Sequence, residues 1–202
     1  MKNNNSIAAW LFTPFRFIAG TRALIIGLAV MLLLSVLGYL SNTHFDGALD
    51  IHYGCLNTDT LYLPHIIYQL VGWGLLTLVF YLTARIVTKS SIRLIDIAGT
   101  MALSQAPLIF AALLGFIPSF HICMGDINTI NLGEMMALLK ENAVMMTVAG
   151  LVTMLFAIWS IVLKYNAYSV SANIKGVVGG ISFTIALIVA EILSKIVLYI
   201  VL

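Results

Sequence analysis

The stretch LIDIAGTMALSQAPLIFAALLGFIP, residues 94–118, decides the fold of this chain. It is apolar over most of its length. At about 1.5 Å of helical rise per residue, it is long enough to cross a hydrocarbon core about 30 Å thick. Asp96 stands one turn inside its start, and Ser104, Gln105 and Pro107 fall near its middle. The stretch is therefore predicted to be a membrane-spanning helix with a polar interruption.

The small and weakly polar residues of this stretch share one helical face at about 100° per residue. They are Asp96, Thr100, Ser104, Pro107, Ala111 and Gly115. Helices in lipid meet through small residues and polar contacts, so we expect this face to pack against neighbouring spans. Pro107 has no amide proton and crowds the carbonyl of Leu103, which predicts a kink whose freed backbone group Ser104 covers. The alternative is a broken helix that lines a substrate path, as in transporters.

The composition places the chain among membrane proteins. Of its 202 residues 61% are hydrophobic and 9% are charged, and the mean hydropathy is +1.06. Such values lie far outside the range of water-soluble domains. The net charge of +2 is small, and the basic residues lie at the ends of apolar segments rather than in a patch, so no nucleic-acid partner is expected.

Four further apolar segments complete the predicted fold, an all-α polytopic membrane protein with five transmembrane helices. They are residues 23–40, 64–87, 143–163 and 176–202. Residues 1–22 form a cytoplasmic and interfacial segment, and residues 23–202 form the membrane domain that contacts the lipid bilayer. An N-terminal interfacial amphipathic helix is predicted over residues 7–20 because Trp10 and three phenylalanines suit the headgroup level. This segment alternatively extends the first span.

The distribution of basic residues predicts the orientation. Eight of the ten Lys and Arg residues lie on the side of the N-terminus, and such an excess marks the cytoplasmic face. The chain is therefore expected in the cytoplasmic (inner) membrane of a bacterial cell, with its N-terminus in the cytoplasm and its C-terminus outside.

The two long loops on the outer side, residues 41–63 and 119–142, hold the cysteines and the histidines of interest. A disulfide between Cys55 and Cys123 fits an oxidising compartment, and two unpaired thiols are the alternative. The residues His44, His52, Cys55, His121 and Cys123 are candidate ligands for zinc or copper. Their spacing matches no known metal motif, and a polar surface that happens to use histidine is the simpler interpretation. No cofactor is predicted.

Glu191 and Lys195 are the charged residues that lie well inside an apolar run. They are four residues apart with the glutamate first, the favourable order for a helical ion pair. Charges at this depth rarely face lipid, so we expect a pair that faces the bundle. The functional alternative is a relay for protons or ions.

The chain resembles the Yip family of small membrane proteins, whose eukaryotic members are named for interacting with Ypt/Rab GTPases. The resemblance is carried by the Phe-Thr-Pro-Phe stretch at 12–15, Asp96 after a basic hairpin, the Ser-Gln-Ala-Pro stretch at 104–107, Trp159 and the glycine Gly176 that begins the last span. It implies a five-span architecture and, for short bacterial-type members, no established activity.

The expected function is that of a non-enzymatic integral membrane protein of Yip type, with a role in membrane organisation or partner binding. The cytoplasmic loops 88–93 and 164–175 are the expected docking surface, because they carry basic and hydrogen-bonding groups. One alternative is a small permease that uses Gln105, Glu191 and Lys195. A second alternative is an envelope metal- or redox-linked protein that uses the outer Cys/His loops. The sequence leaves open whether the chain forms a homo-oligomer.

Overall fold

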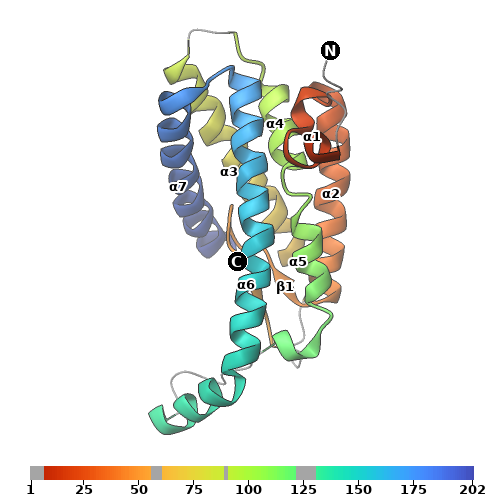
Figure 1. The fold of residues 1–202 in the computed structure, drawn as a ribbon, viewed down its shortest axis with the longest axis vertical. Helices are drawn as coiled ribbons and strands as arrows, with labels where there is room; N and C mark the ends of the chain where they lie inside the picture. The colour runs from red at the N-terminus through yellow and green to blue at the C-terminus, as the bar shows by residue number, and fades with distance from the viewer. Residues whose placement is uncertain (1–6, 56–60, 89–90, 122–130) are drawn as a thin grey trace.

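The computed structural model describes residues 7–55, 61–88, 91–121 and 131–202, and in these residues the chain forms a helical bundle (Figure 1). Its long helices are α2 (Gly20–Leu40), α3 (Tyr62–Val87), α6 (Leu132–Ala172) and α7 (Gly176–Val201), together with a pair of shorter ones in line, α4 (Leu94–Leu103) and α5 (Leu108–Leu114). The described residues thus contain five helices, α4 and α5 counted as one, that are long and apolar enough to cross a membrane. The predicted all-α fold is confirmed at this level.

Short elements fill the ends of the bundle. The helix α1 (Ile7–Phe12) and the 3₁₀ turn η1 (Pro14–Arg16) precede α2, and the 3₁₀ turn η2 (Pro118–Phe120) follows α5. Two short antiparallel strands, β1 (Thr43–His44) and β2 (His52–Tyr53), lie between α2 and α3. The predicted interfacial helix over residues 7–20 is therefore broken in two, because Pro14 ends α1 and starts the next turn.

The helix pair α4 and α5 lies at the centre of the bundle. In the most apolar 18-residue segment of this pair, 67% of the residues are buried. The corresponding segments of the other four helices are 17–33% buried. Thr100, Ser104 and Ala111 are fully buried, so the predicted packing face does meet neighbouring helices. Gly27 of α2 permits a close approach to α4, because a Cβ there would lie only 2.5 Å from the Cβ of Ala102.

The third span is interrupted rather than merely kinked. Between α4 and α5 the backbone changes to tighter turns, in which Ala106 N–H donates to Leu103 O and Leu108 N–H donates to Gln105 O. Leu103 O therefore finds a partner despite the missing amide proton of Pro107. Ser104 O accepts its hydrogen bond from Ser160 of α6. The prediction that Ser104 itself covers the freed group is wrong, since its hydroxyl donates to Met101 O.

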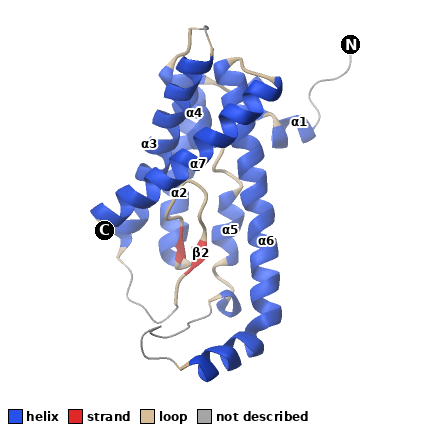
Figure 2. Cartoon of the chain, turned by 90° about the vertical axis from the view of Figure 1, so that its left-hand side faces the viewer, coloured by secondary structure: helices blue, strands red, loops and turns tan. Residues whose placement is uncertain are grey.

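The helix α6 is much longer than the predicted fourth span of residues 143–163. It includes residues 132–142 of the expected outer loop at one end and most of the expected loop of residues 164–175 at the other. Asn131 caps its start by accepting from the N–H of Glu134, and Asn173 ends it in the left-handed conformation. Its first turns extend beyond the end of the bundle, and α6 and α7 diverge with distance from the short connection that joins them (Figures 1 and 2).

Candidate functional site

The connection between β1 and β2 enters the helical bundle. We call residues 45–51 the re-entrant loop. It rises from the two strands into the middle of the bundle (Figure 2), where Phe45 and Ala48 are buried. The sequence predicts a polar loop on the outer surface here, which is wrong for this segment. Irregular backbone at membrane depth is tolerated only where protein surrounds it or where it lines a cavity.

Two side chains of α7 hold the backbone of this loop. The Glu191 carboxylate accepts from the N–H of Leu49 at 2.8 Å, and the Ser194 hydroxyl accepts from the N–H of Ala48 at 3.1 Å. Gly47 lies against the same carboxylate, since a Cβ there would come within 2.7 Å of Glu191 Oε1. On the opposite side Gly72 of α3 packs on Gly47 O. Glu191 and Ser194 thus accept hydrogen bonds from backbone N–H groups that would have no partner in the lipid.

The polar residues of the loop gather around Lys195. Its ammonium group lies 3.2 Å from Asp46 Oδ2 and 2.5 Å from Asp50 Oδ2, and His52 Nδ1 lies 3.1 Å from Asp46 Oδ1. We call Asp46, Asp50, His52 and Lys195 the charged edge. The predicted ion pair within α7 is wrong, because Lys195 pairs with the loop and Glu191 accepts from the backbone N–H of Leu49. Both charges face protein, as expected for their depth.

Contacts within the charged edge shift the pKa values of Asp46 and His52, and burial shifts that of the neighbouring His44. Burial alone would raise the pKa of Asp46, but the contact with His52 and the charge of Lys195 outweigh burial and hold that pKa well below its usual range. The contact with Asp46 likewise raises the pKa of His52, against the effect of burial. Burial lowers the pKa of His44 to about 4, with smaller contributions from His52 and His65. Asp46 is therefore ionised at neutral pH, while His44 is neutral.

Of the candidate metal ligands, the structure brings His44 and His52 together but engages His121 elsewhere. The rings of His44 and His52 stack at 4.9 Å between centroids, and His65 lies 5.0 Å from His44. The two ring nitrogens of His121 lie 2.6 Å from Gly54 O and from Gly115 O, so hydrogen bonds occupy both. The ligand atoms of Asp46, Asp50 and His52 do lie within 4.8 Å of one another, but the ammonium of Lys195 already bridges both carboxylates.

The cysteines are only partly described. Cys55 follows β2 and is disulfide-bonded. Cys123, its predicted partner, lies outside the described residues. Asn42 Nδ2 donates to Cys55 O at 2.6 Å, and the neighbouring Gly54 is held by His121. The end of this loop is therefore fastened to the bundle by hydrogen bonds as well.

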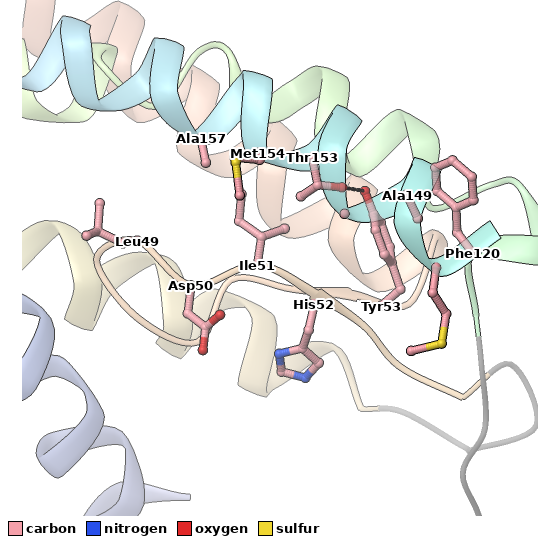
Figure 3. Close-up of a pocket in the computed structure, with 12 residues that line it drawn as sticks. Leu49, Asp50, Ile51, His52, Tyr53, Phe120, Ala149, Thr153, Met154 and Ala157 are labelled. Atoms are coloured by element: carbon pink, nitrogen blue, oxygen red, sulfur yellow. Dashed lines mark hydrogen bonds between the residues drawn. The ribbon is translucent and has the colours of Figure 1, made fainter. Parts of the chain in front are cut away.

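Two clefts flank the charged edge. One, of about 410 Å³, runs between the loop and α6 and is lined by Leu49 to Tyr53, Phe120 and a row on α6 that includes Ala149, Gly150 and Met154. In Figure 3, Ile51 and Tyr53 point toward α6, while Asp50 and His52 point away from it. The other, of about 820 Å³, is lined by Asp46, Tyr68, Lys195 and the apolar end of α7. Each cleft thus has mainly apolar walls and is lined in part by residues of the charged edge.

A second polar group lies deeper, where sequence reasoning expected a cytoplasmic loop. Lys164 is 1% exposed, and its ammonium donates to Ser160 Oγ at 2.5 Å. Glu191 is within its electrostatic reach. The predicted docking loop of residues 164–175 is therefore wrong, because α6 continues to Ala172 and leaves only residues 173–175 as a connection. Of loop 88–93, residues 89–90 lie outside the described part, and Arg93 pairs with Asp96 at 2.8 Å.

Gln105, the third residue proposed for a permease path, is buried beneath the re-entrant loop. The cavity that it lines, together with Gly47, Gln69 and Gly72, measures about 10 Å³. This is room for about one water molecule. Among the described residues, the two large clefts thus lie at the side of the bundle, and the cavity at Gln105 holds no more than about one water molecule.

No protein-family model matches the chain, and no similar curated protein or solved structure was found. The chemistry of the site therefore rests on its own residues. Sequence reasoning singled out Glu191, Lys195 and His52, but it missed Asp46 and Asp50 as their partners. The available signal was the run of apolar and small residues Phe45, Gly47, Ala48, Leu49 and Ile51 in a loop expected to be polar.

Proposed function

We propose that the protein is a non-enzymatic integral membrane protein of the Yip type that holds a membrane lipid at its side, in the opening between α6 and α7, and so serves membrane organisation. The observation that carries the proposal is the charged edge flanked by two largely apolar clefts of about 410 and 820 Å³. Sites for small molecules commonly measure about 300–1,000 Å³ and combine apolar walls with a few polar groups. A lipid offers the matching pattern of one polar headgroup and two apolar chains.

The depth of the charged edge suits a lipid headgroup. Lys195 stands six residues before the end of α7 at Val201, which is about 9 Å along the helix axis. With the C-terminus outside, that level is the boundary between headgroups and acyl chains of the outer leaflet. The proposal takes the inner membrane and the orientation from the basic residues on the N-terminal side. The Yip part of the proposal rests on the sequence motifs that contain Pro107, Trp159 and Gly176.

Lipid that stays with the purified protein tests this function. The full chain is extracted in mild detergent and analysed by native mass spectrometry. Gly150→Leu is expected to abolish retained phospholipid, because a side chain there projects into open space within the cleft along α6. Gly180→Leu is the matched control, since it also meets open space but lies on α7 outside both clefts. Equal lipid retention by the two variants would contradict the proposal.

A further inference from the structure

We propose that the lipid held at this opening is a two-chain phospholipid whose headgroup carries a primary amine, as in phosphatidylethanolamine. The inference rests on the proposed function and names the headgroup that the charged edge would select.

The edge presents groups of both charge signs. The carboxylates of Asp46 and Asp50 lie beside the ammonium of Lys195 and the imidazole of His52. The side chains of Asp50 and Lys195 remain 47% and 40% exposed, so each keeps a face toward the opening. A zwitterionic headgroup meets both, with its ammonium on Asp50 and its phosphate near Lys195 and His52. Charge-assisted hydrogen bonds of this kind are about twice as strong as neutral ones.

The exposed acceptor on the edge favours an ammonium with N–H groups. The Asp50 side chain is 47% exposed. Its carboxylate binds Lys195 through Oδ2, so its second oxygen, Oδ1, is available to accept a hydrogen bond from a headgroup. A primary ammonium carries three donors. A quaternary choline group carries none, and a glycerol headgroup carries no cation.

The shape of the opening favours two chains. The cleft along α6 contains Asp50 and His52, and the cleft along α7 contains Asp46 and Lys195. The charged edge thus contributes residues to both apolar grooves, one along α6 and one along α7. With one acyl chain in each groove, the headgroup lies on the charged edge. A lipid with a single acyl chain would fill only one of the two grooves.

Binding of defined lipids to the delipidated full-length protein tests the inference. The probes are dioleoyl phosphatidylethanolamine, its mono-, di- and trimethylated forms and dioleoyl phosphatidylglycerol, measured by native mass spectrometry. The affinity is expected to fall at least about tenfold from the primary amine to the trimethyl form, which is about 1.4 kcal/mol. Asp50→Asn is expected to remove most of this ratio. Glu134→Gln, an exposed acid at the start of α6, is expected to keep it.

The outcomes separate the two proposals. Equal affinity for all five lipids, lost in Gly150→Leu, would overturn the headgroup assignment and leave lipid binding in place. No saturable binding of any lipid would overturn both. If Asp50→Asn does not fold, as judged by its thermal unfolding, Asp46→Asn replaces it. The methylation series on the unchanged protein decides the question in either case.

Discussion

At the scale of single residues, Gly72 decides how closely α3 approaches the re-entrant loop. A methyl group there would lie 2.9 Å from Gly47 O, which is backbone and cannot turn aside. Gly72→Ala is expected to lower the free energy of unfolding by about 1–3 kcal/mol. Gly74→Ala, two residues along the same helix, meets open space and is expected to stabilise by up to about 1 kcal/mol. Thermal unfolding in detergent distinguishes the two variants. Equal changes in melting temperature would show that the re-entrant loop does not pack against Gly72 as described.

His44 makes the fold sensitive to acid. Its folded pKa of about 4 lies below the ordinary value of 6.5, so the unfolded chain takes up the proton first as the pH falls through this range. Stability is therefore expected to decline between pH 6.5 and 4, by about 1–2 kcal/mol after allowance for partial exposure. His52 has a raised pKa, so its stabilisation is complete below pH 6.5 and is lost as the pH rises.

The comparison of His44→Gln with the unchanged protein isolates the first effect. Melting temperatures measured from pH 7 to pH 4 are expected to fall less in the variant, because both proteins retain His52. Identical slopes would mean that His44 is not shielded from water in the folded protein.

Single residues also show which contacts could not be predicted from the sequence. Glu191 and Lys195 were recognisable as unusual because they interrupt an apolar run. Their partners were not, since Leu49 and Asp50 precede them by 142 and 145 residues. Helical spacing relates only residues three or four apart, so it suggested the wrong pair.

At the scale of elements, the break between α4 and α5 depends on Ser160 of α6. Its hydroxyl donates to Ser104 O and accepts from the buried Lys164. Ser160→Ala leaves both groups without this partner and is expected to cost about 1–3 kcal/mol. Thr184→Ala is the control, because that exposed hydroxyl bonds only to a carbonyl of its own helix among the described contacts, and its expected change is within about 0.5 kcal/mol. A similarly small effect of Ser160→Ala would mean that the interruption is stable without α6.

The elements themselves were largely readable from hydropathy. The first, second and last spans begin and end within three residues of α2, α3 and α7. The errors concern the third and fourth spans. Pro107 predicts a kink. Whether the helix bends or ends there depends on which groups of neighbouring helices donate hydrogen bonds to the carbonyls that the proline leaves without a partner. The predicted fourth span ends at residue 163, before the charge of Lys164, because charges usually mark the membrane boundary. In the structure that lysine is buried.

At the scale of the whole molecule, the orientation is the property on which the outer-leaflet assignment depends. Alkaline phosphatase fused after Leu202 is expected to be active, because the enzyme folds only outside the cytoplasm. The same reporter inserted after Asn173, between α6 and α7, is expected to be inactive. The reverse pattern would place the charged edge in the inner leaflet and contradict the predicted topology.

The seating of the re-entrant loop has a consequence for how the protein is made. The loop lies between the first two long helices, but Glu191, Ser194 and Lys195, which hold it, belong to α7 and emerge from the ribosome after every other helix described. Until then its amides and aspartates have no partner on α7, so nascent chains stalled before α7 should be prime targets for quality-control proteases. Completion of the bundle thus waits for translation of its final helix.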